Sequence, residues 1–334
     1  MPDIRIGISG WTYAPWRGTF FPHGLRQSEE LAYASQRVRS IEINGTFYSL
    51  QTPASFARWA QSTPDDFIFS VKAPRFITHI TRLKGGRVPL ANFFASGVLR
   101  LGEKLGPILW QLPPSLRFDP PVIESFLKSL PHDTAAAARL GRHHDAHVRQ
   151  PWLKPGSHRA LRHALEVRHA SFATPEFIQM LRRHEVAVVV ADTAGKWPLI
   201  EDVTADFIYI RLHGDEKLYV SGYTPTALRR WAAKIRGWTE GRTPRDAALV
   251  ATRPPAGPSR DLYVYFDNDV KTRAPYDAMN LAYLLKLGPK PSRGPSMRSI
   301  KELPRTDWPG YPSRARTPVR APSASQSRRA AKKK

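Results

Sequence analysis

Charged side chains stand inside short apolar runs of this 334-residue chain. The run "SIEIN" carries Glu42 between two isoleucines, "HALEVR" carries Glu166, and "YIRLHG" carries Arg211. Because successive residues of a β-strand face opposite sides of the sheet, the aliphatic residues of each run share one face and the charged residues share the other. Two carboxylates that meet on such a face could act as general acid and general base, with burial raising the pKa of one of them.

The order of these runs along the chain predicts the fold that must position the charged residues. Eight β-like runs cover residues 4–9, 40–44, 67–72, 107–112, 163–168, 186–192, 207–214 and 262–268. Amphipathic helical patterns lie between or after them, at residues 28–37, 53–61, 92–104, 119–129, 174–184, 225–237 and 275–287. Eight strand–helix alternations are typical of a closed (β/α)8 TIM barrel, an α/β fold. A doubly wound sheet is the competitor, but no G-x-G-x-x-G motif follows the first run.

In such a barrel the polar face of each strand lines the lumen, and functional residues gather at the C-terminal ends of the strands. We therefore expect one site at that mouth. Its candidate catalytic residues are Glu42, Glu166, His213 and Asp192. Its candidate ligand-binding residues are Trp11, Tyr13, Asn44, Phe47, Tyr48, Lys72, His79, Gln111, Arg168, Arg211 and Asn268. The phases of Asp192 and Asn268 are less clear than the others. The alternative is an internal salt-bridge network that only holds the top of the barrel together.

The basic residues of this set favour an anionic ligand. Lys72, Arg168 and Arg211 could bind a phosphate or carboxylate, which arginine recognises with its fork of N–H donors. Carboxylates and imidazole at the same mouth could instead hold a divalent metal. The three cations would already neutralise those acids, so we predict no metal ligands and leave the cofactor open.

The formal net charge of +23 is spread unevenly along the chain. From Lys290 onward there are 13 Lys/Arg against Glu302 and Asp307, so this part carries +11 and the preceding part +12. Such an excess predicts attraction to polyanions, nucleic acid first. The Pro-, Ser- and Arg-rich composition of residues 289–334 predicts a disordered tail, because few apolar groups are available to offset the entropy of ordering. Residues 1–288 then form a single barrel domain, with a His/Arg-rich insertion at about 132–160.

Composition also bears on the compartment. No run approaches 18 uninterrupted apolar residues, so the sequence predicts no transmembrane helix and no membrane partner. The N-terminal "MPDIRIGISGW" shows no secretory signal. The absence of cysteine removes disulfides and thiolate metal sites and fits the cytoplasm.

Seven segments of the chain, in order, carry a resemblance to a known family. They are "GISGWTYAPWRGTFFP", "SIEINGTFYSLQTPASFARWA", "FSVKAPRFITHITRL", "LGPILWQLPPSLRFD", "HALEVRHASF", "YIRLHG" and "VYFDNDVKTRAPYDA". Over residues 4–287 the sequence resembles the YecE-like family, a domain of unknown function whose fold is similar to a TIM barrel. The resemblance adds Pro113, His169 and Asp267 to the candidate positions. It implies no particular reaction.

Three hypotheses follow. The first is an enzyme, such as a hydrolase, lyase or isomerase, in which Glu42 or Glu166 is the acid or base. The second is a nucleic-acid-associated protein or metal-dependent phosphodiesterase that uses the basic surface and tail. The third is a non-catalytic scaffold, in which the acids of the mouth pair internally with its bases.

Overall fold

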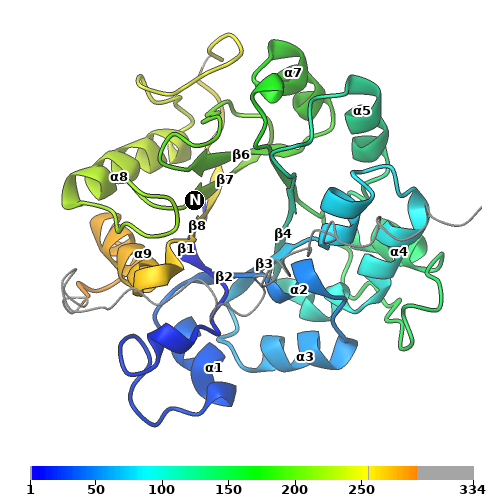
Figure 1. Cartoon of the computed structure of the whole chain (residues 1–334), viewed down its shortest axis with the longest axis horizontal. Helices are drawn as coiled ribbons and strands as arrows, with labels where there is room; N and C mark the ends of the chain where they lie inside the picture. The colour runs from blue at the N-terminus through cyan, green and yellow to red at the C-terminus, as the bar shows by residue number, and fades with distance from the viewer. Residues whose placement is uncertain (1, 255, 292–334) are drawn as a thin grey trace, which may run out of the picture. The chain divides into compact units, whose positions relative to one another are not determined.

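Eight parallel strands close into a barrel in the computed structural model, which describes residues 2–254 and 256–291 (Figure 1). The strands are β1 (Ile4–Ser9), β2 (Ser40–Ile43), β3 (Ile68–Lys72), β4 (Leu105–Gln111), β5 (His163–Glu166), β6 (Ala187–Asp192), β7 (Phe207–Leu212) and β8 (Asp261–Phe266). Each pairs with the next in sequence, and β8 pairs with β1. The predicted (β/α)8 fold is confirmed. The predicted tail from 289 onward lies outside the described residues except for 289–291, and the boundary at 288 stays a prediction.

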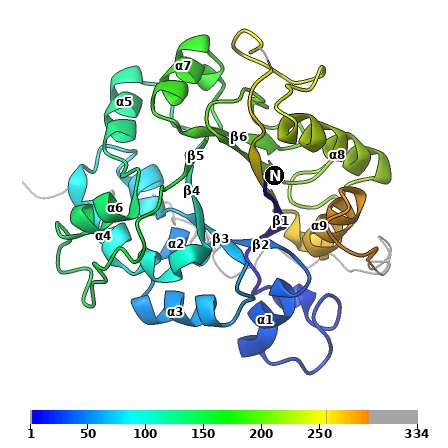
Figure 2. The ribbon, with the colours of Figure 1, turned by 180° about the vertical axis from the view of Figure 1, so that it is seen from behind.

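Helices surround the barrel on the outside (Figures 1 and 2). They are α1 (Glu30–Ser35), α2 (Gly45–Tyr48), α3 (Pro53–Gln61), α4 (Arg87–Ala95), α5 (Pro120–Lys128), α6 (Thr134–Gly141), α7 (Pro175–Arg183), α8 (Pro225–Thr239) and α9 (Arg273–Leu284). The π-helical turn η3 (Phe76–Ile80) and the 3₁₀ segment η4 (Val98–Lys104) flank α4. Among the described helices, none has both the length and the apolar character needed to cross a bilayer.

The helix predicted over residues 92–104 is wrong as a single element. Gly97 has φ of +113°, a backbone conformation that ends α4 and separates it from η4. Elsewhere the helix starts follow local chemistry. Thr52, Asp119 and Thr174 each accept a hydrogen bond from a backbone N–H of the first turn, and each is followed by proline.

The two faces of the strands bury different clusters. Alternate aliphatic residues, such as Ile41 and Ile43, pack against the helices. The opposite face fills the lower lumen with a smaller cluster that includes Leu109, Tyr209 and Tyr265. The hydroxyl of Tyr265 lies 2.7 Å from that of Ser40 and 2.8 Å from that of Ser70, and this polar layer is the floor of the mouth.

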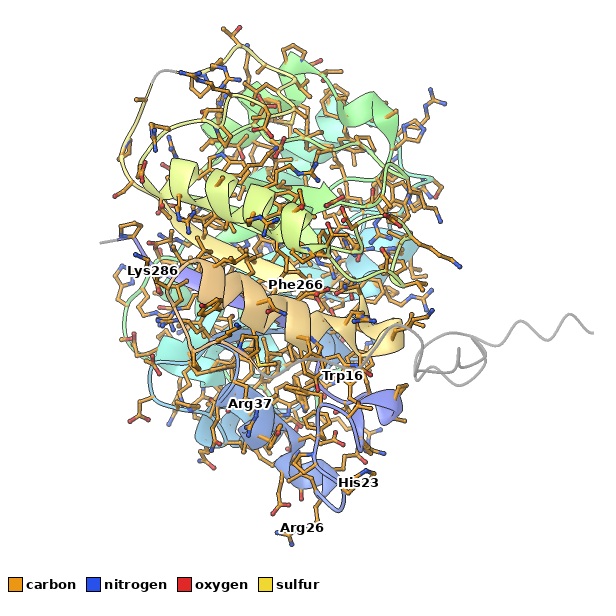
Figure 3. The ribbon with its side chains drawn as sticks, turned by 90° about the vertical axis from the view of Figure 1, so that its left-hand side faces the viewer. Trp16, His23, Arg26, Arg37, Phe266 and Lys286 are labelled. Carbon is orange, nitrogen blue, oxygen red and sulfur yellow. The ribbon has the colours of Figure 1, made fainter. Side chains whose placement is uncertain are left out.

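The segment between β1 and α1 is anchored to the last helix. Trp16 is fully buried and donates its indole N–H to the carbonyl of Asp269 at 3.3 Å. The hydroxyl of Tyr276 on α9 donates to the carbonyl of Thr19 at 3.2 Å. Figure 3 shows Trp16 next to α9. This contact fixes the loop that carries Tyr13 over the mouth.

Candidate functional site

Arg211 is the centre of the polar cluster in the lumen, and its side chain is fully buried. It points inward from β7 and binds Glu42 in a bidentate pair, with Nε 3.1 Å from Oε2 and Nη2 2.9 Å from Oε1. Nη1 donates to Glu166 at 2.7 Å, and Nη2 donates to Asp267 at 2.9 Å. The remaining N–H faces Nε2 of His213 at 3.5 Å. All five guanidinium donors are therefore used within the protein.

Glu42 is equally satisfied. Its Oε1 accepts from the Ser9 hydroxyl at 3.1 Å and its Oε2 from the Tyr209 hydroxyl at 2.7 Å, in addition to the two bonds from Arg211. Strands β1 and β7 thus supply the donors, and β2 supplies the carboxylate. The glutamate inside the apolar run of β2 is there as the counter-ion of a buried arginine. This pairing is the one that the internal-network alternative predicts.

Glu166 extends the network toward solvent. Its Oε1 accepts from Nε of Arg168 at 2.7 Å. Burial opposes its ionisation, but Arg168 and Arg211 together hold the pKa of Glu166 well below its usual range. A carboxylate that stays ionised at neutral pH cannot serve as a general acid. Glu166 instead orients Arg168.

Arg168 itself lies at the edge of the cluster, with 11% of its side chain exposed. Its guanidinium stacks 3.9 Å from the ring centroid of Trp197, and Nη2 is 3.3 Å from the hydroxyl of Tyr219. Within the described residues, Nη1 of Arg168 has no hydrogen-bond partner. Its position is fixed by Glu166 and Trp197, and it keeps donors for a ligand.

Asp267 and His213 form the other flank of Arg211. Nδ1 of His213 lies 3.0 Å from Oδ2 of Asp267. Burial and the neighbouring Arg211 lower the pKa of His213, so the imidazole is neutral. Because Arg211 can only donate, Nε2 is the acceptor, which places the ring proton on Nδ1 toward Asp267. Burial opposes ionisation of Asp267, yet Arg211 and His213 hold its pKa below the usual range.

Asp269 has the opposite protonation state. Burial and the nearby Asp267 raise the pKa of Asp269 well above the usual range, which favours its neutral form. It is hydrogen-bonded to Tyr13, whose hydroxyl also lies 2.5 Å from the carbonyl of Ser9. The pKa values of these two neighbouring carboxyls are thus shifted in opposite directions.

Lys72 projects into the same space from the end of β3. Its Nζ lies 4.4 Å from the ring centroid of Phe47 and, among the residues that the structure describes, has no hydrogen-bond or ion-pair partner. Burial and the positive charge of Arg211 lower the pKa of Lys72 to about 8, against the opposing effect of Glu42, Asp267 and Glu166. The side chain is half-buried and therefore open to a ligand.

Aromatic rings form the rim beside Lys72. The ring of Phe47 makes edge contacts with Tyr48 at 5.2 Å and with His79 at 5.0 Å. Burial, Lys72 and Arg168 lower the pKa of His79 to about 4, so His79 is a neutral ring at physiological pH. The predicted rim residues Phe47, Tyr48 and His79 therefore come together, whereas Tyr13 contacts Ser9 and Asp269. Trp11 packs edge-on against Trp59 of α3 at 5.6 Å and supports the rim from outside.

Three amide side chains of the predicted set, Asn44, Gln111 and Asn268, have a side-chain oxygen without a partner among the described residues. Asn44 and Gln111 share the inward phase of β2 and β4, and the side-chain oxygen of each is buried with no partner in the described part of the chain. Buried polar atoms without partners cost stability, so these oxygens mark places where a ligand donor would be accommodated.

Asp192 and Asn268 do not join the cluster, and the expectation that they converge on the mouth is corrected. Asp192 shares the phase of Val190 on the outer face of β6 and accepts from the Tyr223 hydroxyl at 3.2 Å. Asn268 donates to Asp277 of α9 at 2.8 Å. Each stands one residue out of phase with the lumen, at a strand end where alternation alone left the face open.

The predicted site did not include several members of the network, among them Ser9, Tyr209, Tyr219 and Asp269. Asp267 entered only through the family resemblance. The alternation of "LYVYFDN" could have found it, since Tyr263 and Tyr265 face the lumen and Asp267 continues their phase. No group of three or more His, Asp or Glu side chains in the described ranges is arranged to hold a metal ion.

The closed parallel barrel and the charged cluster at the C-terminal ends of its strands define a TIM-barrel protein. Within that class the chain belongs to the family described as "Protein of unknown function DUF72", whose model matches residues 5–299. The resemblance seen in the seven sequence segments is thereby confirmed.

Similar proteins agree with this assignment. The chain is 32% identical to UPF0759 protein YecE of Escherichia coli over 131 residues, 38% of this chain and 44% of the relative. It is 27% identical to UPF0759 protein YunF of Bacillus subtilis over 119 residues, 33% and 40% of the two chains. These matches span less than half the length of the curated relatives.

Solved structures show the same fold. A DUF72 family protein from Thermotoga maritima superposes with a TM-score of 0.63 at 23% identity, covering 85% of this chain and 99% of the other. A DUF72 family protein from Enterococcus faecalis gives a TM-score of 0.62 at 15% identity, covering 87% and 100%.

Proposed function

We propose that the C-terminal mouth of the barrel binds a small anionic molecule, a carboxylate or phosphate, between Lys72 and Arg168. The proposal rests on two half-buried cations at the mouth, Lys72 and Arg168. Each has N–H donors without a hydrogen-bond partner among the described residues. Both act electrostatically on Glu166 and His79, so both lie near these two residues. Trp197 and Phe47 each stack on one of the two cations and hold it in place.

The sequence suggested Arg211 as a third anion-binding group. We assign it a structural role instead. Its donors are used by Glu42, Glu166 and Asp267, so it holds the network in place. Glu42 and Glu166 as acid and base remain an untested prediction, and the proposed function does not require them. The unused oxygens of Asn44 and Gln111 favour a ligand that also carries hydroxyl donors.

Removing either cation should weaken anion binding. Lys72→Met and Arg168→Met are each expected to reduce the affinity for inorganic phosphate or malonate by about 10- to 100-fold, because each loses one charged hydrogen bond to the ligand. Isothermal titration calorimetry at pH 7 checks this. Affinity should also fall as pH rises through about 8, where Lys72 loses its proton.

Lys84 offers a matched control, since it is an exposed lysine on the loop after η3. Lys84→Met should leave the affinity unchanged. Equal losses in Lys84→Met and Lys72→Met would point to general charge attraction and contradict a site at the mouth.

The net charge of +23 supports a second candidate function, association with nucleic acid. Counterion release predicts that affinity for duplex DNA or RNA falls steeply with salt. Deleting residues 289–334 removes a net charge of +11, and we expect this deletion to abolish most of that affinity in a filter-binding assay. Undiminished affinity in the truncated protein would assign binding to the barrel surface. A cysteine-free chain of this kind is proposed to act in the cytoplasm.

A further inference from the structure

Lys72 has the surroundings of a nucleophilic amine. It ends β3 on the lumen face, its Nζ lies against the Phe47 ring, and no carboxylate of the described residues forms an ion pair with it. The acids that could pair with it are already bound, Glu42 and Glu166 by arginines. Partial burial and the nearby permanent charge of Arg211 favour the neutral form of this amine.

The lowered pKa of Lys72 agrees with this arrangement. With a pKa of about 8, roughly a fifth of Lys72 is neutral near pH 7.4, against about one in a thousand for an ordinary lysine. The ammonium form binds the anion, and the neutral minority can attack a carbonyl carbon. The two roles therefore coexist at physiological pH.

Arg168 determines which carbonyl compound fits. Its guanidinium is fixed by Glu166 and Trp197 with Nη1 left for a ligand. Nη1 carries two N–H donors, and a carboxylate is an acceptor suited to them. A molecule that presents a carbonyl to Lys72 and a carboxylate to Arg168 is an oxo acid, and the 2-oxo acids are the smallest of this class. We propose that Lys72 forms an imine with the carbonyl carbon of a small 2-oxo acid whose carboxylate is bound by Arg168; this rests on the proposed anion-binding function.

The step balances without a further reactant. Nζ attacks the carbonyl carbon, and a proton passes from nitrogen to the former carbonyl oxygen to give a carbinolamine. The hydroxyl then takes one proton from solvent and leaves as water, so that amine, ketone and proton become iminium and water. Neither oxidant nor reductant is consumed.

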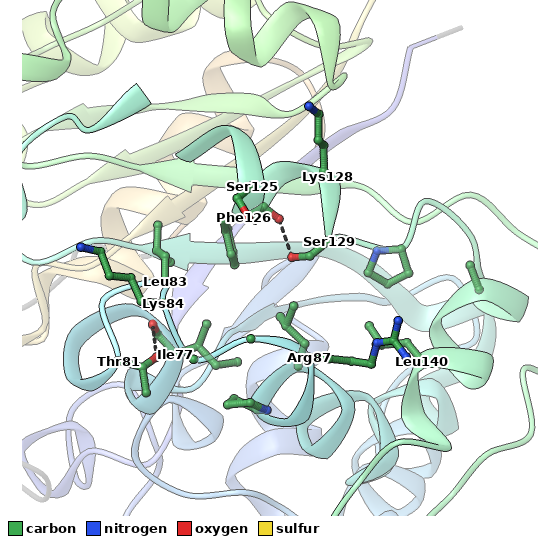
Figure 4. A pocket seen from close by; sticks show the side chains of 16 residues that line it. Ile77, Thr81, Leu83, Lys84, Arg87, Ser125, Phe126, Lys128, Ser129 and Leu140 are labelled. Atoms are coloured by element: carbon green, nitrogen blue, oxygen red, sulfur yellow. Dashed lines mark hydrogen bonds between the residues drawn. The ribbon is translucent and has the colours of Figure 1, made fainter. Parts of the chain in front are cut away.

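The imine can be trapped by reduction with cyanoborohydride. Full-length protein is incubated with pyruvate and the reductant near pH 7.4, and the adduct is counted by intact mass and located by peptide mapping. Lys72 should carry the adduct on the order of 10- to 100-fold faster than Lys84, which lines a separate surface cavity of about 520 Å³ between η3, α4, α5 and α6 (Figure 4). Lys72→Arg should lose the fast adduct, and Lys84→Arg should keep it.

Two further measurements separate the outcomes. Arg168→Gln should lower the rate with pyruvate by about 10-fold and leave the rate with acetaldehyde, which has no carboxylate, unchanged. Phosphate affinity is measured on the same samples. Phosphate binding that depends on Lys72, without a preferred adduct on Lys72 in the wild-type protein, overturns the imine and leaves the proposed function standing. If the wild-type protein shows neither phosphate binding that depends on Lys72 nor a preferred adduct on Lys72, both the imine and the proposed anion-binding function are overturned.

Discussion

Replacing Arg211 with methionine is expected to lower the free energy of unfolding by about 3–5 kcal/mol. The substitution removes the only partner that binds Glu42, Glu166 and Asp267 at once among the described residues, and leaves two fully buried carboxylates without that cation. A loss of this size is a large part of the 5–15 kcal/mol that usually stabilises a domain. Urea denaturation followed by circular dichroism measures it.

Two variants show that the loss comes from uncompensated charge. Adding Glu42→Gln to Arg211→Met should recover part of the stability, because one of the stranded carboxylates is gone. Arg26→Met is the matched control, since Arg26 pairs with Glu29 at the exposed surface, and no measurable change is expected. If Arg211→Met were as stable as the wild-type protein, the network could not be what holds the mouth together.

The sequence predicted which strand residues face the lumen, because the alternation of apolar and polar residues is a local property of each strand. Aliphatic residues at every second position placed Glu42, Lys72, Glu166 and Arg211 on the inner face, and the structure has them there. Alternation did not settle the faces of Asp192 and Asn268, because the runs "VAVVVAD" and "LYVYFDN" are apolar on both faces and these residues stand at strand ends. There one residue decides the face, and the contacts with Tyr223 and Asp277 that decide it come from distant segments.

The sequence did not predict which acids of the cluster pair with which arginine. Nothing local in "YIRLHG" says that Arg211 will be saturated by three acids while Arg168, with the same side chain, keeps free donors. That difference follows from the register of β2, β5 and β8 around the barrel, which brings three carboxylates to β7 and one to Arg168. The helix interrupted at Gly97 is a similar case, because the backbone of Pro53 approaches closely there.

A large pH effect on stability is expected from Asp277, which is buried on α9 outside the lumen. Its Oδ2 accepts from the backbone N–H of Tyr223 at 3.0 Å and from Asn268 at 2.8 Å. Burial raises the pKa of Asp277 to about 6, although both hydrogen bonds oppose the shift. The folded protein therefore binds the proton more tightly than the unfolded chain. This contribution to stability is fully present below the unfolded pKa of about 3.8 and is lost as pH rises to about 6.

Asp277→Asn should remove that pH dependence. An amide oxygen in place of Oδ2 can accept both hydrogen bonds, and the side chain no longer titrates. The stability of the variant relative to the wild-type protein should increase by about 2–3 kcal/mol between pH 4 and pH 6.5 and stay constant above that range. Urea unfolding at a series of pH values measures this difference. The exposed Asp65→Asn should give a flat profile, and a flat profile for Asp277→Asn as well would mean that Asp277 ionises in the folded protein as it does in the unfolded chain.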